Sequence, residues 1–273
     1  MKNQDPDSEI DNDLDLDLFT DPPGYYPPSP PPTTETYTLL SGNTVKLDLI
    51  GHSPLWGHHL WNAGRVTSSY LEAHPEIVCG KKVLELGAGA GLPSLVCAYL
   101  EAECVVITDY PDTALIENLK SNVERVKNEI NTVRKSNGLK SRLVVQGHCW
   151  GEDCQSILSH ITDEKNSGFD VLILADLLFN HSEHRKLLVT VQRTLKKQED
   201  AKALVFFTPY RPWLLEKDLM FFEIVKNAGM KVEKILEEKT EKLMFEKDRG
   251  DPELRKTIFG YIVKWDLQMP CQQ

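Results

Sequence analysis

The segment from Lys82 to Pro93 reads KVLELGAGAGLP. It begins as a mainly apolar stretch and then places three glycines within five residues, at positions 87, 89 and 91. Glycines that follow the first strand of a doubly wound sheet allow the backbone to approach a ligand at the start of the next helix. We therefore expect a strand over 82–86, a ligand-binding turn after it and a helix over 92–100.

Strands and helices alternate on both sides of this turn. Apolar runs predict further strands over 44–50, 104–108, 143–146, 169–174, 203–207, 231–236 and 257–264. Helical patterns lie between them, one ending near Leu71 and others spanning 113–128, 182–195 and 218–228. This alternation is typical of an α/β fold with a doubly wound, mostly parallel sheet and helices on both faces. Only a charged loop joins the last two strands, so we expect that pair to be antiparallel.

The glycine turn argues against several common nucleotide sites. A dinucleotide fingerprint requires a third glycine at position 92, where the chain has Leu92. The chain also lacks the Gly-Lys-Ser/Thr sequence of a phosphate loop. Glu85 lies two residues before the turn, and a carboxylate there would repel a pyrophosphate. These features favour a positively charged nucleoside ligand without phosphates, such as S-adenosylmethionine.

Two residues after later strands are candidates for binding the same ligand. Asp109 ends the second strand of this series, 22 residues after Gly87, where a carboxylate can accept hydrogen bonds from both ribose hydroxyls. Its alternative role is to cap the following helix. Trp150 follows the third strand, where adenine would lie, and its alternative role is that of a core tryptophan.

Several motifs together resemble those of the seven-β-strand methyltransferases that methylate lysine. The family pattern is Glu-x-Gly-x-Gly after the first strand, an acid after the second, and Asp-x-x-Phe/Tyr after the fourth. This chain has Gly87-Ala88-Gly89, Asp109, Trp150 and Ala175-Asp176-Leu177-Leu178-Phe179. Segments 27–32, 53–64 and 108–111 resemble a fungal branch of the family that acts on translation elongation factor 1-alpha. The resemblance covers residues 14–265, nearly the whole chain.

The resemblance implies a seven-stranded, Rossmann-like methyltransferase sheet with an antiparallel last strand, and S-adenosyl-L-methionine as the cofactor. It also implies a protein substrate, because the fungal branch methylates the N-terminal amine and an adjacent lysine of translation elongation factor 1-alpha. Carried over by position, the cofactor contacts are Trp56, Gly87, Ala88, Gly89, Asp109, Trp150 and Ala175. We expect Ala175 to contribute its backbone, because relatives have serine or alanine there.

Methyl transfer to an amine depends on positioning more than on acid–base chemistry. We expect Asp176 to hold the target amine, Phe179 to present an aromatic face to it, and Tyr210 to form a second wall. The alternatives are a helix cap near Ser182 for Asp176 and loop packing for Tyr210. We do not expect a histidine base, because the sequence shows no partner for any candidate: His58, His59, His181 and His184.

Two other functions remain open at this point. A small-molecule methyltransferase for a pyridine such as nicotinamide would share the cofactor residues and differ only in its substrate walls. A non-catalytic adaptor with a methyltransferase-like fold would need a broken cofactor turn, whereas Gly87, Gly89 and Asp109 are intact.

The formal net charge of −10 is unevenly distributed. Residues 1–21 hold seven aspartates and one glutamate against one lysine, and so carry −7 of that charge. A proline-rich stretch follows, and we expect residues 1–36 to be a disordered arm and 37–273 the methyltransferase domain. The arm is either a solvating tail or a docking segment for a basic partner. The nearly neutral body predicts no nucleic-acid partner.

Other classes of protein are excluded by composition. No segment reaches the roughly 18 consecutive apolar residues of a membrane span, and the acidic N-terminus does not resemble a signal or transit peptide. The six cysteines contain no Cys-x-x-Cys pair, which argues against a zinc site or a disulfide framework. We expect a cytoplasmic protein with no membrane partner and no metal, and we expect it to be a monomer.

Overall fold

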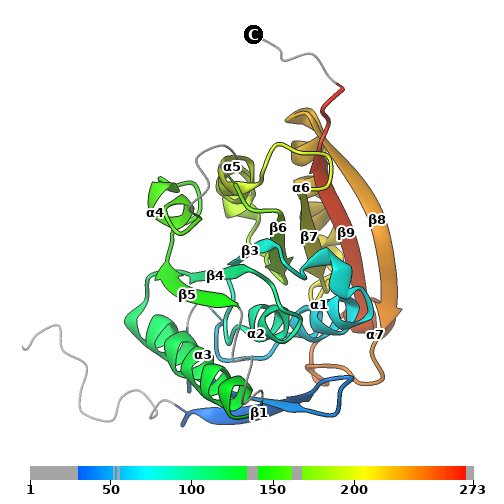
Figure 1. Ribbon diagram of the computed structural model, residues 1–273. Helices are drawn as coiled ribbons and strands as arrows, with labels where there is room; N and C mark the ends of the chain where they lie inside the picture. The colour runs from blue at the N-terminus through cyan, green and yellow to red at the C-terminus, as the bar shows by residue number, and fades with distance from the viewer. Residues whose placement is uncertain (1–29, 52, 54–55, 134–140, 162–167, 269–273) are drawn as a thin grey trace, which may run out of the picture. The chain divides into compact units, whose positions relative to one another are not determined.

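The fold is organised around a sheet of seven strands (Figure 1). The computed structural model describes residues 30–51, 53, 56–133, 141–161 and 168–268, and residues 31–273 make up one unit. The strands of the sheet are β3 (Lys82–Leu86), β4 (Cys104–Asp109), β5 (Arg142–Gly147), β6 (Val171–Ala175), β7 (Lys202–Phe207), β8 (Met230–Lys239) and β9 (Thr257–Trp265). Their order is β5-β4-β3-β6-β7-β9-β8. β3 to β7 pair in parallel, and β9 runs antiparallel to both β7 and β8, which confirms the expected topology.

Helices cover both faces of this sheet (Figure 1). They are α1 (Asn62–Ala73), α2 (Leu92–Tyr99), α3 (Thr113–Val133), α4 (Gln155–Leu158), α5 (His184–Thr194), α6 (Leu215–Asn227) and α7 (Pro252–Lys256). Side chains of α1, α2 and α3 share one hydrophobic core with one face of the sheet. Side chains of α4, α5 and α6 share a second core with the other face. In the described part of the chain no helix is both long and apolar enough to cross a membrane.

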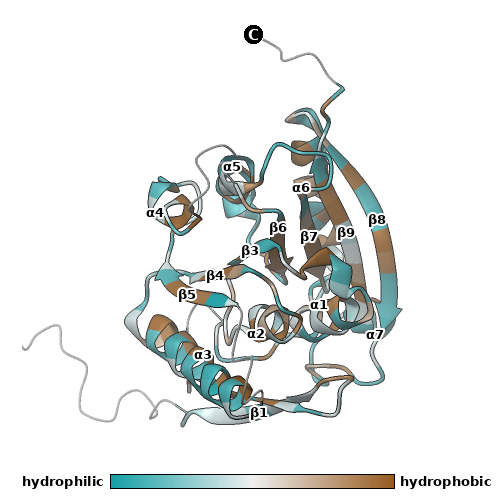
Figure 2. Ribbon diagram, in the orientation of Figure 1, coloured by the Kyte–Doolittle hydropathy of each residue, from teal (hydrophilic) through white to brown (hydrophobic). Residues whose placement is uncertain are grey.

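The strands explain why there are two cores, because successive side chains of a strand point to opposite faces. In β3, Val83 belongs to the first core and Leu84 to the second; in β4, Val105 and Val106 divide in the same way. A strand buried on both faces reads as an unbroken apolar run, as β6 does. Figure 2 shows this apolar character along β6 and β7.

The strand order places a topological switch point between β3 and β6. Within the sheet, β4 and β5 lie on one side of β3, and β6 and β7 lie on its other side. Doubly wound sheets bind ligands in the crevice outside the carboxyl ends of the strands at such a point. The glycine turn after β3 and the residues after β6 therefore lie on either side of the expected site.

One strand, β1, and two helices, α4 and α7, were not predicted from the sequence. Residues Thr33–Thr38 form a strand, β1, that pairs antiparallel with β2 (Thr44–Leu49), so the ordered part begins before the boundary predicted at residue 37. Tyr37 is the only buried residue of β1, which explains why no apolar alternation marked it as a strand. Residues 1–29 of the predicted arm lie outside the described residues. Helix α7 was also not predicted within the charged loop between β8 and β9.

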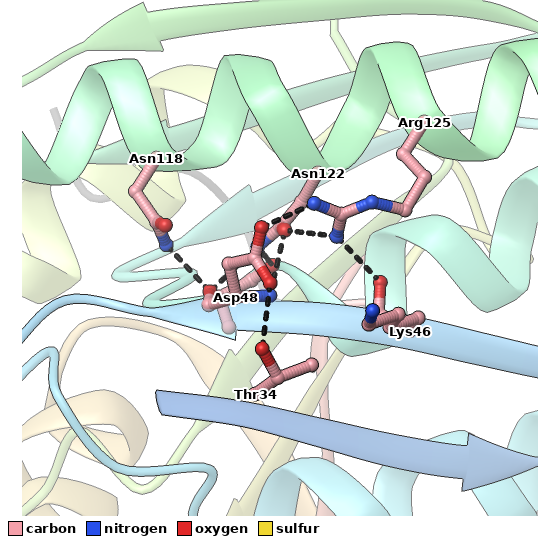
Figure 3. A network of polar contacts seen from close by, with 7 residues as sticks. Thr34, Lys46, Asp48, Asn118, Asn122 and Arg125 are labelled. Atoms are coloured by element: carbon pink, nitrogen blue, oxygen red, sulfur yellow. Dashed lines mark hydrogen bonds and ion pairs between the residues drawn. The ribbon is translucent and has the colours of Figure 1, made fainter. Parts of the chain in front are cut away.

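The β1–β2 hairpin is fastened to α3 by a polar network (Figure 3). Asn122 of α3 is fully buried, accepts a hydrogen bond from the Asp48 N–H at 2.9 Å and donates to the Asp48 carbonyl at 3.0 Å. Arg125 pairs with the Asp48 carboxylate and donates to the Lys46 carbonyl at 3.1 Å. Asn122 also donates to the Ala90 carbonyl at 3.2 Å. One side chain thus links the hairpin and α3 to the glycine turn.

We expect Asn122→Ala to lower the free energy of unfolding by about 2–4 kcal/mol. The change leaves the Asp48 N–H and the Ala90 carbonyl without this partner, and an unsatisfied buried group costs about 1–3 kcal/mol. Asn118→Ala is the matched control, because it removes one bond to the Asp48 carbonyl that Asn122 still satisfies, and it should cost less than about 1 kcal/mol. Urea unfolding measures both values, and equal costs would contradict the role given to Asn122.

Candidate active site

Two adjoining pockets lie at the carboxyl ends of the parallel strands. The larger pocket, of about 600 Å³, is lined by the glycine turn and by residues that follow β4, β5 and β6. The smaller pocket, of about 310 Å³, is lined by residues that follow β6 and β7 and by the loop between β8 and β9. Four residues line both pockets: Trp56, Trp61, Asp176 and Phe179. Every site residue predicted from the sequence lines one or both of these pockets.

The glycine turn depends on backbone conformations that other residues rarely adopt. Gly87 and Gly89 have φ angles of 61° and 56°, in the left-handed region. A Cβ on Gly87 would lie 2.5 Å from Cδ2 of Leu177, so any other residue there would force the Leu177 side chain to shift. A Cβ on Gly89 would meet nothing within 4 Å, which leaves open space beside the backbone. Ala88 also lines the larger pocket. Its N–H donates to the Thr108 carbonyl at 3.0 Å and is therefore not available to a ligand.

Glu85 does not behave as the charged group that the sequence argument assumed. It is 1% exposed, accepts the Ser94 N–H at 3.1 Å and is also hydrogen-bonded to the Ser94 hydroxyl. Ser94 stands in the first turn of α2, so Glu85 caps that helix from the preceding strand. Burial raises the pKa of Glu85 to about 8, and it is therefore mainly protonated at neutral pH. The argument against a dinucleotide site thus rests on Leu92 rather than on this charge.

Asp109 is held at the larger pocket by two backbone donors. The N–H of Gly89 lies 2.7 Å from Oδ2, and the N–H of Tyr110 lies 2.6 Å from Oδ1. A carboxylate has about four lone-pair positions, so two remain for further donors such as a pair of hydroxyls. The helix-cap alternative is wrong, because Asp112 accepts the Leu115 N–H at 3.1 Å and caps α3.

Trp150 and Ala175 line the larger pocket from the ends of two strands on either side of the glycine turn. Trp150 follows β5, is half-buried and packs against the second core, with a ring carbon 3.4 Å from where a Gly87 Cβ would lie. Trp150 therefore packs against the core and also lines the pocket, so the two predicted roles are compatible. Ala175 is the last residue of β6.

Asp176 joins three chain segments through its carboxylate. Oδ1 accepts the N–H of Thr208 after β7 at 2.7 Å, and Oδ2 accepts the N–H of Ala63 in the first turn of α1 at 3.1 Å. The Tyr210 hydroxyl lies 3.5 Å from Oδ2. The predicted alternative was a cap for the helix near Ser182, but the helix that Asp176 caps is α1. Burial raises the pKa of Asp176 to about 7, against the opposing effect of the two N–H donors.

Three aromatic rings that pack against one another line the smaller pocket. The ring centroids of Trp61, Tyr210 and Phe245 are separated by 5.1 Å, 5.8 Å and 5.9 Å. Tyr210 and Phe179 were predicted from the sequence, whereas Trp61 and Phe245 were missed as site residues. The aromatic stretch at 56–61 was a usable signal for Trp61. Phe245 stands in a charged loop, where nothing in the sequence marks it.

Charged side chains also line the smaller pocket. Three are acidic and one is basic: Asp176, Asp218, Asp248 and Arg211. Phe245 and Asp248 both belong to the loop between β8 and β9. The buried guanidinium of Arg255 donates to the backbone carbonyls of both residues and so fixes the loop against the pocket. Arg211 donates to the Phe179 carbonyl at 2.6 Å and fixes the opposite wall.

The structure gives three of the candidate histidines partners that the sequence did not show. His181 Nε2 lies 2.6 Å from Oδ1 of Asp218, and His184 Nε2 donates to the Leu178 carbonyl at 2.8 Å. His58 accepts the N–H of Ser53 at Nδ1. Burial lowers the pKa of His184, which favours its neutral form. Among the described residues, no group of three or more His, Cys, Asp or Glu side chains is placed to hold a metal ion.

A family model described as lysine methyltransferase matches residues 51–228. The chain belongs to the lysine methyltransferase family. The matched span runs from just before Trp56 to the end of α6, and it contains the glycine turn, Asp109 and Asp176. Phe245 and Asp248 lie beyond it.

The chain is similar to fungal proteins over nearly its whole length. It is 50% identical over 250 residues to a Neurospora crassa protein, which covers 91% of this chain and 87% of that protein. It is 42% identical over 256 residues to a Schizosaccharomyces pombe protein, which covers 92% and 96% respectively. Both relatives are named protein N-terminal and lysine N-methyltransferase efm7.

A solved structure from Pyrococcus horikoshii shares the fold. It is provisionally described as an RNA methyltransferase, and the match has a TM-score of 0.51 with 17% identity, covering 82% of this chain and 93% of that chain. At this identity the likeness concerns the fold alone.

As a lysine methyltransferase, the chain uses S-adenosylmethionine as its cofactor. The larger pocket fits this molecule in size, since ligand pockets commonly enclose about 300–1,000 Å³. It also fits in chemistry: Asp109 keeps lone pairs for hydroxyls, Trp150 offers a flat apolar ring, and Asp176 stands at the boundary with the smaller pocket. The roles of the individual residues in cofactor binding stay a prediction.

We expect Asp109→Ala to raise the dissociation constant for S-adenosylmethionine by at least about tenfold, because hydrogen bonds to a charged group contribute about 1.5–3 kcal/mol. Asp112→Ala is the control, since it removes a helix cap three residues away and leaves the pocket lining intact. Isothermal titration calorimetry measures both affinities. Unchanged affinity in Asp109→Ala would remove this carboxylate from the cofactor site.

Proposed function

We propose that this chain transfers methyl groups from S-adenosylmethionine to the N-terminal amine and an adjacent lysine of translation elongation factor 1-alpha. The names of the fungal relatives support the two amine types. The resemblance of the motifs at 53–64 and 108–111 to the fungal branch supports the substrate protein. Membership of the lysine methyltransferase family supports methylation of an amine.

The observation that carries this proposal is the chemistry of the smaller pocket. Its walls combine the rings of Trp61, Tyr210 and Phe245 with the carboxylates of Asp176 and Asp218. Ring faces and carboxylates both attract a cation, and an amine substrate arrives from water as an ammonium ion. The pocket adjoins the larger one at Asp176, so an amine held there would face the cofactor side.

The residues of the chain act mainly by positioning the amine. The bound cofactor supplies an electrophilic methyl group on a sulfonium sulfur. Asp176 attracts the ammonium and cannot swing away, because the N–H groups of Ala63 and Thr208 hold both of its oxygens. Orientation of this kind supplies about 7–11 kcal/mol of the barrier reduction. Burial raises the pKa of Tyr210 well above its usual range, so its hydroxyl stays protonated and donates.

The pyridine alternative is less well supported by this pocket. A neutral pyridine ring would stack on the aromatic walls, but it carries no charge for the three carboxylates to attract before methylation. The adaptor alternative would require a damaged cofactor turn, and the glycine turn and Asp109 have the geometry of an intact one.

The substrate test uses purified enzyme, labelled S-adenosylmethionine and a lysate from cells that lack this activity. We expect label in a protein of the size of elongation factor 1-alpha, with methyl groups located by mass spectrometry on its N-terminal residue and a nearby lysine. Asp109→Ala enzyme serves as the background. Label confined to small molecules would favour the pyridine alternative, and no transfer with cofactor bound would favour the adaptor.

The raised pKa of Asp176 predicts a pH dependence for binding of the product. A peptide with a trimethylated N-terminus keeps its positive charge at every pH, so its affinity reports the charge of the pocket. Asp176 is deprotonated above its pKa of about 7, and we expect affinity to fall about tenfold between pH 8 and pH 6. Asp176→Asn should weaken binding at pH 8 and reduce this slope. Equal wild-type affinity at both pH values would contradict the assignment.

A further inference from the structure

A histidine–aspartate pair lies at the smaller pocket, which its aspartate lines. His181 belongs to a short 3-10 turn after β6, and Asp218 lies in the first turn of α6, 37 positions later. Their side chains approach to 2.6 Å between Nε2 and Oδ1. Asp218 is 5% exposed and lines the smaller pocket, whereas the side chain of His181 remains 24% exposed. The pair therefore connects the pocket with solvent.

The reaction requires a proton to leave the substrate. The nitrogen attacks with its lone pair, so an ammonium must become a neutral amine before each transfer. At pH 7.5 an α-amine with a pKa of about 7.8 is roughly one-third neutral, whereas a lysine with a pKa of about 10.4 is roughly 0.1% neutral. A proton acceptor in the pocket is therefore of small value for an N-terminal amine and of large value for a lysine.

We propose that the Asp218–His181 pair is the proton acceptor for the substrate amine and that methylation of lysine depends on it. This rests on the proposed function, because it assumes that both amine types enter the smaller pocket. An N–H bond of the ammonium breaks and the proton joins the pair at Asp218. The freed lone pair then forms the new C–N bond as the C–S bond of the cofactor breaks. Asp218 passes the proton to Nε2 of His181 across their 2.6 Å contact, and the imidazolium then releases a proton to water, which restores the pair.

Asp176 lines the same pocket and can also take up a proton, but protonation there competes with two backbone donors. Both of its oxygens accept backbone N–H groups, from Ala63 and Thr208, and these bonds favour the charged form. In Asp218, Oδ1 faces His181, and within the described part of the chain no hydrogen-bond donor is assigned to Oδ2. A proton can therefore add to Asp218 without displacing a backbone contact.

The surroundings of the pair suit reversible protonation. Burial raises the pKa of Asp218, while His181 and Arg211 oppose that effect. The ring of His184 lies 5.5 Å from that of His181 and hydrogen-bonds the Leu178 carbonyl, so it supports the pair without offering a second charge. The carboxylates of Asp176 and Asp248 also line this pocket.

The test compares two peptides that present one amine each, both with the N-terminal sequence of elongation factor 1-alpha. One has a free N-terminus and arginine in place of lysine, and the other is acetylated at the N-terminus and keeps its lysine. Full-length wild type, Asp218→Asn and His181→Gln are assayed with both peptides from pH 7 to pH 9.5. Calorimetric affinity for S-adenosylmethionine and thermal unfolding show whether each variant is folded.

We expect the variants to lower kcat for the lysine peptide by about 100-fold at pH 7.5, as removal of a general base does. The kcat for the N-terminal peptide should fall far less, because that amine is already partly neutral. Asp218→Asn also removes a carboxylate from the pocket lining, so it should raise KM for both peptides. The lysine deficit should shrink as the pH rises to 9.5. In a third variant, His181→Ala, added imidazole should restore part of the lysine activity. His160→Gln is the control, because His160 bonds Gln146 away from both pockets and should leave both rates unchanged.

The possible negative results of this test bear on different claims. Equal losses for the two peptides, or a lysine deficit that does not change with pH, would show a structural role for the pair and overturn the proposal alone. Wild-type enzyme that binds cofactor but methylates neither peptide would overturn the proposed function and this inference with it.

Discussion

The carboxylate of Asp176 is the contact on which the arrangement of the site depends. It binds the N–H groups of Ala63 and Thr208, which lie in α1 and after β7, and its own backbone has a φ of 56°. A non-glycine residue in a rarely populated backbone region costs about 1–3 kcal/mol and persists only where its surroundings hold it. Here two backbone donors hold it, and displacing the carboxylate would release both neighbouring segments.

This constraint also sets the electrostatics of the smaller pocket. Burial disfavours the charged form of Asp176 and the two N–H donors favour it, which leaves the pKa at about 7. A cation entering the pocket shifts that balance toward the carboxylate, and the carboxylate is already in place when it arrives. Charges fixed in advance stabilise a reacting group without reorganisation, which is how electrostatic contributions to catalysis are usually made. The strained, buried acid is thus suited to a substrate of opposite charge.

The parts of the site that could be predicted are those that depend on short, local stretches of sequence. The glycine turn, Asp109 and the buried strand β6 each follow from local spacing or an apolar run, and their bounds agree with the structure to within two residues. Long-range contacts could not be predicted in this way. Asp176 caps a helix that begins 114 residues earlier, as its bond to Ala63 across 113 positions shows. Phe245 enters the pocket from a charged loop, and the protonation of Glu85 depends on burial that no local pattern reveals.

A pocket built from aromatic rings and carboxylates binds positive charge but discriminates little between the groups that carry it. Trp61, Tyr210 and Phe245 offer no hydrogen-bond pattern that would separate an N-terminal ammonium from the end of a lysine side chain. The two amines do differ strongly in how tightly they hold a proton. In such a site, acceptance of both amines follows from the walls, and the relative rates follow from proton removal. Asp176, whose oxygens accept backbone N–H groups, then orients the amine. Asp218, which faces the partly exposed His181, sets the rate at which a lysine reacts.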